Sequence, residues 1–242
     1  MFLFIYIATV GLSLESANVV GYSEVGLRFG AKGVGSCFVN VDSTKPVNLQ
    51  DIKATGYASE DGYADEEIYV QPLDAYGRTI ASYYWYDSED DGMHGWYDDE
   101  GEYAEGVILP PGEGLYARAP DESFGLQSAG QVPTSDISVT LRFGAKIVVN
   151  STPVSVNIQN VTVTGYSIED GYADEEVYVQ PLDAYGRTIA SYYWYDSEDD
   201  GMYGWYDDEG ELVEDFEITA GESVYARAPD NTFSMVFPGV TL

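Results

Sequence analysis

One stretch of the chain occurs twice and decides the fold: residues 56–102 read GYASEDGYADEEIYVQPLDAYGRTIASYYWYDSEDDGMHGWYDDEGE. It returns 109 positions later as residues 165–211, and only four of its 47 positions differ. The differences are Ala58/Ser167, Ser59/Ile168, Ile68/Val177 and His94/Tyr203. Shorter matches on both sides extend the repeat to about 110 residues, which predicts two tandem units of one fold.

Within each unit, runs rich in Tyr, Val, Ile and Trp alternate with turn signals. Residues 67–71 and 79–86 flank an Asp/Gly turn at residues 74–77, which predicts a β-hairpin. A second turn of the same kind follows at residues 98–101. No window shows sustained helical periodicity. We therefore expect an all-β protein of two tandem antiparallel β-sandwich or barrel-like repeats, each with about seven or eight strands.

The ends of the two units are also marked in the sequence. We expect residues 15–130 to form the first β repeat and residues 131–242 the second, because Gly, Pro and Ser cluster at the boundary. Residues 1–14, MFLFIYIATVGLSL, are uncharged and apolar but too short to cross a bilayer as a helix. They match either a secretory signal peptide or an apolar N-terminal strand. Both interpretations predict a secreted or cell-surface protein without a transmembrane segment.

The strongly negative charge of the chain limits the classes of molecule that it can bind. Forty-two acidic residues against ten basic ones give a formal net charge of −32. This charge argues against nucleic acid, because binding to phosphates needs a basic face. It favours metal cations or basic partners. Eight of the ten basic residues are repeat pairs, such as Arg78/Arg187, and we expect them to form structural salt bridges or to hold loop carbonyls.

Catalytic chemistry has little support. The chain has one cysteine, Cys37, and one histidine, His94, which is replaced by Tyr203 in the second copy. A Ser-His-Asp or Cys-His arrangement would depend on that single histidine. Carboxylates are abundant, but abundance without a cleft signal does not indicate a glycosidase. We expect no enzymatic activity.

The acidic residues are concentrated in the repeated block, which holds fourteen acids and one base in each copy. Asp87, Glu89 and Asp91 alternate along a tight loop that ends at Gly92, an arrangement that resembles a calcium loop. The alternative is a solvated acidic loop that keeps the protein soluble. The candidate ligands for Ca²⁺ are Asp87, Glu89, Asp91 and Asp98 in the first copy and Asp196, Glu198, Asp200 and Asp207 in the second.

The aromatic residues form the other candidate site. On a strand, Tyr83 and Trp85 point to one side, and Tyr84 and Tyr86 point to the other. One side is expected in the core, and the other side could stack on sugar rings. The alternative is core packing with cross-strand aromatic pairs. The candidate ligand-binding residues are Tyr83, Trp85, Trp96, Tyr192, Trp194 and Trp205.

Two short motifs resemble those of uncharacterised secreted bacterial tandem β-repeat proteins. They are residues 15–22, ESANVVGY, and residues 111–121, PGEGLYARAPD. The resemblance implies export and a surface or extracellular role.

Together these features predict a non-enzymatic structural protein of the cell surface. We expect self-association into a homopolymer, a filament in which residues 2–10 of one subunit complete a sheet of the next. That segment is apolar, rich in β-formers and free of charge and proline. The alternative function is a calcium-assisted carbohydrate-binding module that acts in adhesion to a polysaccharide.

Overall fold

The fold is seen in a computed structural model. It describes residues 20–27, 30–34, 47–56, 68–74, 76–88, 92–119, 124–142, 144–165, 177–183, 185–197, 201–228 and 232–241. These residues are almost entirely β-strands and turns. No helix among them is long and apolar enough to cross a membrane.

The first half contains ten described strands. They are β1 (Val20–Leu27), β2 (Gly30–Val34), β3 (Val47–Asn48), β4 (Lys53–Thr55), β5 (Tyr69–Pro72), β6 (Tyr83–Ser88), β7 (Met93–Asp98), β8 (Ile108–Leu109), β9 (Leu115–Ala119) and β10 (Phe124–Gln131). A short 3-10 helix, η1 (Leu49–Asp51), joins β3 to β4.

The second half repeats this series. Its strands are β11 (Ile137–Leu141), β12 (Gly144–Val149), β13 (Val156–Asn157), β14 (Thr162–Thr164), β15 (Tyr178–Pro181), β16 (Tyr192–Ser197), β17 (Met202–Asp207), β18 (Glu217–Ile218), β19 (Ser223–Ala228) and β20 (Phe233–Phe237). The 3-10 helix η3 (Ile158–Asn160) corresponds to η1.

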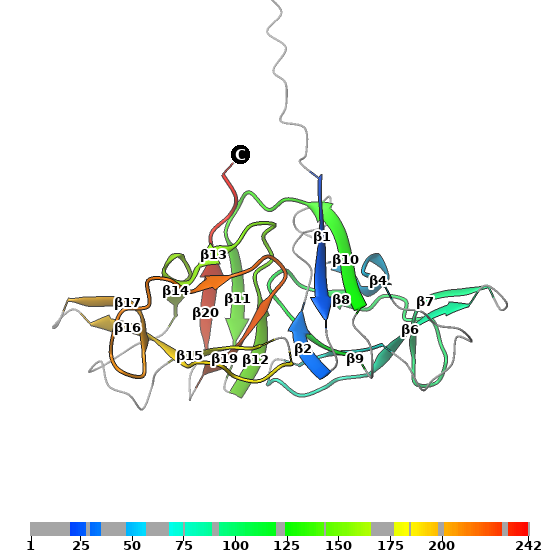
Figure 1. The fold of residues 1–242 in the computed structure, drawn as a ribbon, viewed down its shortest axis with the longest axis horizontal. Helices are drawn as coiled ribbons and strands as arrows, with labels where there is room; N and C mark the ends of the chain where they lie inside the picture. Colours follow the sequence, from blue (N-terminus) through cyan, green and yellow to red (C-terminus); the bar gives the residue numbers. More distant parts are fainter. Residues whose placement is uncertain are drawn as a thin grey trace, which may run out of the picture.

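The two halves share one sheet plan (Figure 1). The first half has sheets in the order β1-β10-β4, β2-β9-β5-β6-β7 and β3-β8, and the second has β11-β20-β14, β12-β19-β15-β16-β17 and β13-β18. The strand pairs in these sheets are antiparallel. The β6–β7 and β16–β17 hairpins project toward opposite ends of the long axis of the molecule (Figure 1).

A buried core lies between the three-stranded and the five-stranded sheet of each half. In the first half, Val25 and Leu126 from one sheet join Val70 and Ala117 from the other in a single apolar cluster. The corresponding cluster of the second half connects β11 and β20 to β15 and β19. Burial of apolar surface is the dominant force that holds such layers together.

The all-β prediction is confirmed, and so is the hairpin around residues 74–77, where β5 pairs with β6. The structure has more strands than expected because short pairs such as β3–β8 form separate two-stranded sheets. The unit boundary near residue 130 stays a prediction. Residues 1–14 lie outside the described residues.

The halves meet where a side chain of one fills space left by glycines of the other. Gly33 on β2 and Ile147 on β12 hold equivalent positions, opposite Tyr116 and Tyr225 respectively. Ile147 is fully buried. A Cβ placed on Gly33 would lie 2.8 Å from the Ile147 Cγ2 atom, and one on Gly114 would overlap that atom. We call this contact, formed by Gly33, Gly114 and Ile147, the glycine hollow.

The contact is reciprocal. Ser223 is the counterpart of Gly114, and its hydroxyl lies against Gly33. Tyr116 and Tyr225, also counterparts, pack together against Ile147. Burial raises the pKa of the Tyr116 hydroxyl, and the neighbouring Tyr225 raises it further. Contacts that exchange equivalent positions are typical of a twofold interface, so the halves pack like the subunits of a twofold dimer.

Backbone pairing and one ion pair strengthen the junction. Residues 112–114 run along the outer edge of β12: the Gly114 amide donates to the Ile147 carbonyl (3.1 Å), and the Val149 amide donates to the Gly112 carbonyl (2.9 Å). The buried Lys146 ammonium pairs with the Glu113 carboxylate. A buried charge is tolerated only with such a partner, so this pair fixes the register of the two halves.

The glycine hollow predicts the effect of adding one methyl group. Gly114→Ala should lower the free energy of unfolding by about 1–3 kcal/mol, because the new Cβ overlaps Ile147 in a packed interior. Urea unfolding measures this change. Gly26→Ala is the control, since a Cβ there has no heavy atom within 4 Å. Combining Gly114→Ala with Ile147→Ala should cost less than the sum of the two single changes, and strict additivity would contradict the packing described.

Candidate functional site

The repeated block forms a hairpin with two different faces. β6 pairs with β7 in a register that sets Trp85 opposite Trp96 and Tyr84 opposite Tyr97. Because successive side chains on a strand point to opposite faces, the tryptophans share one face and these tyrosines share the other. β16 and β17 pair in the same register. The molecule therefore carries the same two-faced hairpin twice.

The tryptophan face belongs to the core. Trp96 is fully buried, and its indole Nε1–H donates to the Ile52 carbonyl at 2.6 Å. Trp85 packs edge-on against Trp96, with ring centroids 5.2 Å apart. In the second half, Trp205 Nε1–H donates to the Val161 carbonyl at 2.7 Å. A buried indole needs such an acceptor, and these contacts attach the hairpin to η1 and η3.

The six aromatic residues proposed from the sequence for ligand stacking lie on this core side. They are Tyr83, Trp85, Trp96, Tyr192, Trp194 and Trp205. The four tryptophans are at most 7% exposed and offer no ring face to a sugar. Burial thus gives them the core role that the sequence left as the alternative. Tyr83 and Tyr192 are half-buried, and burial raises the pKa of both hydroxyls, with nearby aspartates adding to the shift.

The opposite side of each hairpin is a tyrosine surface that the sequence-based choice of residues missed. We call it the outer tyrosine face. It is formed by the half-buried Tyr84 and Tyr86 with the buried Tyr97 (9% exposed) beneath them in the first half, and by the half-buried Tyr193 and Tyr195 with the buried Tyr206 (9% exposed) in the second. The Tyr84 and Tyr97 rings stack at 6.4 Å and 27°, and Tyr86 meets Tyr97 edge-on at 5.9 Å. The corresponding distances in the second half are 6.1 and 6.0 Å. Strand alternation was the available signal, but it does not say which face is buried.

An acidic turn borders each outer tyrosine face. Asp98 Oδ1 accepts hydrogen bonds from the backbone amides of Glu100 (3.0 Å) and Glu102 (2.8 Å). Asp207 makes the same two bonds in the second half. Asp98 and Asp207, which were proposed as calcium ligands, thus use one carboxylate oxygen to close a turn. A Cβ on Gly101 of this turn would lie 3.7 Å from the Tyr84 hydroxyl, so turn and ring are neighbours.

The other proposed calcium ligands are only partly described. The Asp87 carboxylate is exposed, and its Oδ1 lies 2.9 Å from His94 Nδ1. Its counterpart Asp196 is also exposed. Glu89, Asp91, Glu198 and Asp200 lie outside the described residues. In the part of the chain that the structure describes, no three His, Cys, Asp or Glu side chains form a group suited to a metal ion. Calcium binding stays a prediction.

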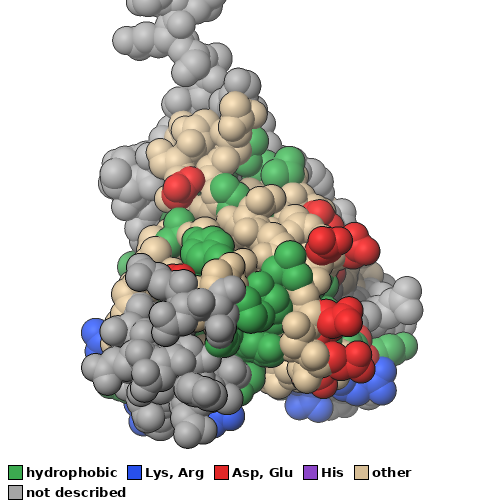
Figure 2. Space-filling view, turned by 90° about the vertical axis from the view of Figure 1, so that its left-hand side faces the viewer, with side chains coloured by type: hydrophobic (Ala, Val, Ile, Leu, Met, Phe, Trp, Pro, Cys, Tyr) green, Lys and Arg blue, Asp and Glu red, His purple; other side chains and the backbone are tan. Residues whose placement is uncertain are grey.

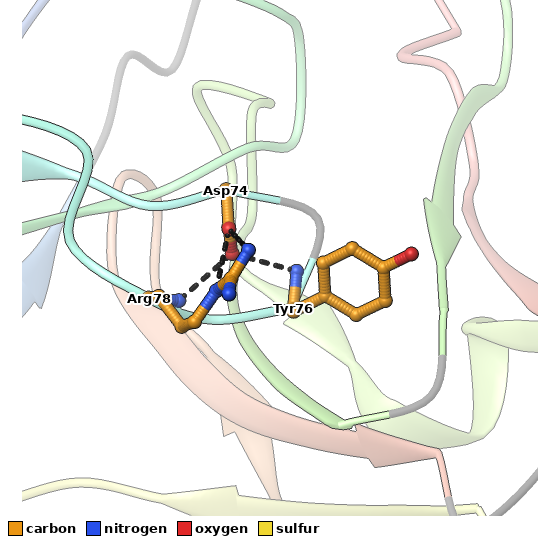
Figure 3. Close-up of polar contacts among 3 residues, drawn as sticks. All are labelled: Asp74, Tyr76 and Arg78. Atoms are coloured by element: carbon orange, nitrogen blue, oxygen red, sulfur yellow. Dashed lines mark hydrogen bonds and ion pairs between the residues drawn. The ribbon is translucent and has the colours of Figure 1, made fainter.

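The β5–β6 loop contains an ordered arginine–carboxylate–tyrosine cluster (Figure 3). Asp74 accepts hydrogen bonds from the Tyr76 and Arg78 amides and from Arg78 Nε, and Arg78 Nη2 lies 2.6 Å from the same carboxylate. The Arg78 guanidinium also lies over the Tyr76 ring, 5.3 Å from its centroid. Hydrogen bonding to Arg78 lowers the pKa of Asp74 below its ordinary value of 3.8. Asp183, Tyr185 and Arg187 repeat the cluster.

A glutamine outside the repeated block positions each hairpin. Gln50 Nε2 donates to the Trp96 carbonyl (2.8 Å) and the Ala104 carbonyl (3.3 Å), while its Oε1 accepts from the Trp96 amide. Gln159 makes the equivalent bonds in the second half. Gln50 and Gln159 therefore satisfy backbone groups on the outer edge of β7 and β17, as the backbone of a neighbouring strand would.

A pocket of about 390 Å³ lies at the junction of the two halves. Its described walls are Pro110, Pro111 and Glu113 of the turn after β8 and residues 131–140, which include most of β11. Ile137 and Val139 of β11 are buried, whereas Ser138 is exposed. The pocket thus follows the length of one edge strand.

Comparisons with family models, with curated proteins and with solved structures gave no match to this chain.

The calcium prediction is tested by heat denaturation. A cation that binds only the folded chain raises the melting temperature as its concentration exceeds the dissociation constant. We expect a higher melting temperature in millimolar calcium than in chelator, and loss of the difference in the variant Asp87→Asn with Asp196→Asn. Asp215→Asn, an exposed acid outside the loops, is the control that keeps the response. Equal melting temperatures with calcium and with chelator would contradict the prediction.

Proposed function

We propose that the protein is a non-enzymatic structural protein of the cell surface or extracellular space, and that it assembles by β-strand addition. The observation that carries the proposal is the pocket along β11. This strand pairs with β20 on one side, and the other side of its ladder has no strand partner among the described residues. An edge strand of this kind presents backbone amides and carbonyls that a strand from another molecule can pair with.

β12 shows the contrasting case of a covered edge. Residues 112–114 run along it and satisfy the Ile147 carbonyl and the Val149 amide. The neighbouring turn residues Pro110 and Pro111 form a wall of the β11 pocket instead of pairing with β11. The fold therefore closes one of the two neighbouring edges of the second half and leaves space along the other.

Residues 2–10, FLFIYIATV, have the chemistry of a strand that could enter this space. They are uncharged, contain no proline and are rich in β-branched and aromatic residues. Addition to a sheet edge gains affinity from main-chain hydrogen bonds and specificity from alternate side chains. Because donor and acceptor are different surfaces, the contact is head-to-tail and builds an open polymer.

The net charge of −32 opposes association of like molecules. An uncharged donor strand adds no repulsion of its own, and salt screens the remaining charge over about 10 Å at 0.1 M ionic strength. Polymer growth is therefore expected to increase with ionic strength. Carbohydrate binding, the alternative, gains no support at the tryptophans because these rings are buried.

Two changes to the full chain test strand addition. Deletion of residues 2–10 removes the donor, and Ser138→Lys places a long charged side chain on the acceptor edge, a device that blocks strand pairing. Each should abolish polymers seen by sedimentation velocity and electron microscopy.

Ser155→Lys, which makes the same change at an exposed serine outside the pocket, is the control and should polymerise normally. Polymers of unchanged length in both altered proteins would contradict strand addition. So would a mature polymer-forming protein that mass spectrometry shows to begin after residue 17.

A further inference from the structure

The outer tyrosine faces occur at both ends of the molecule. The β6–β7 and β16–β17 hairpins extend away from each other along the long axis (Figure 1), and their ring geometries agree within a few tenths of an ångström. On the end that carries β16 and β17, hydrophobic side chains gather at the surface with acidic side chains beside them (Figure 2). Two such surfaces that face apart are suited to holding two partners at once. They differ at one neighbouring position, where Tyr103 packs against Tyr97 and Leu212 is bridged to Tyr206.

The charge beside these faces selects the kind of partner. Asp99, Glu100 and Glu102 are exposed on the turn that borders Tyr84, and Asp208, Glu209 and Glu211 hold the same places in the second half. No ion pair among the described residues uses these six carboxylates. A field of one sign over an aromatic surface favours cationic groups and disfavours anionic ones.

The chain itself shows how such a surface binds a guanidinium. Arg78 lies over the Tyr76 ring and pairs with the Asp74 carboxylate, and Arg187 repeats the arrangement. Arginine suits this environment because its planar group stacks on aromatic rings and bonds carboxylates through a fork of donors. At the outer faces, the turn that carries the exposed carboxylates passes beside the Tyr84 hydroxyl in the first half and the Tyr193 hydroxyl in the second.

The spacing of the rings suggests the form of the ligand. Tyr84 and Tyr86 are two residues apart on one strand, so their attachment points lie about 7 Å apart. Arginines at alternate positions of an extended peptide have the same spacing. We infer that each outer tyrosine face, with its acidic turn, binds an extended polypeptide with arginine at alternate positions, and that the protein cross-links two such segments.

This activity goes beyond assembly by strand addition and does not depend on it, because the hairpins and β11 are different surfaces. It would also let so acidic a protein associate with other material, because basic segments would neutralise the carboxylates at its two ends. Each cation–π contact strengthens binding modestly, so loss of two rings from one face should weaken binding there roughly fivefold or more.

The test uses the full chain and a fluorescent synthetic peptide of alternating arginine and serine. We expect two equivalent sites per chain, weaker binding at high salt, and weaker binding of the lysine–serine peptide. Tyr84→Leu with Tyr86→Leu should leave one site, and adding Tyr193→Leu with Tyr195→Leu should remove both. Tyr185→Leu, an exposed tyrosine outside the faces, is the control that keeps both sites.

A second set of variants tests the same sites even if the tyrosine variants fail to fold. Glu100→Gln with Glu102→Gln alters only exposed side chains and should weaken the first site. The wild-type protein should also agglutinate beads that carry the peptide, whereas a protein with one intact face should bind them without agglutination.

Three results would overturn the inference. The first is no binding of the arginine peptide. The second is binding that persists unchanged without the four tyrosines, which would show attraction by net charge alone. The third is binding of an uncharged oligosaccharide, but not of the peptide, through the same tyrosines. None of these results bears on strand addition, because every variant retains residues 2–10 and β11.

Discussion

Ile147 occupies the hollow between Gly33 and Gly114, and the arrangement of the whole molecule depends on this contact. Packed interiors have little spare volume, so a side chain that fills a hollow permits one relative position of its two walls. Residues 112–114 and the Lys146–Glu113 ion pair then extend the contact along β12. A junction made of side-chain packing, backbone pairing and a buried charge pair resists rotation of one half against the other.

The junction fixes the position of the two repeated halves relative to each other. Each hairpin is attached to its own core through a buried indole and a glutamine, and the cores are fixed to each other at the junction. We therefore expect the two outer tyrosine faces to keep a constant separation. The junction is also asymmetric, since glycines in one half meet Ile147 and Ser223 in the other, so each half is shaped for the other rather than for a copy of itself.

The sequence predicted those features that depend on local chemistry. The Asp/Gly turn at residues 74–77 has a strong local signal, and the structure forms a hairpin there. Alternation also separated Trp85 from Tyr84 correctly. It could not say which face is buried, because that choice depends on the bond from Trp96 to the Ile52 carbonyl, 44 residues away along the chain.

Three other features could not be predicted from local sequence, because they depend on contacts seen only in the folded chain. An aspartate that closes a tight turn and an aspartate that binds calcium look alike in sequence, and only the hydrogen bonds from the Glu100 and Glu102 amides show that Asp98 closes a turn. The glycine hollow has no sequence signal, because Gly33, Gly114 and Ile147 meet only in the folded chain. The junction pocket likewise combines residues 131–140 with the distant Pro110 and Pro111.

The most direct test of a rigid junction is the distance between the two ends of the molecule, measured by electron paramagnetic resonance. Spin labels would be placed on the acidic turns through Asp99→Cys and Asp208→Cys, in a chain whose single native cysteine is replaced by Cys37→Ser. We predict one narrow distance distribution that broadens when Gly114→Val disrupts the glycine hollow. A broad distribution in the protein with an intact hollow would contradict it, because the two halves would then move independently.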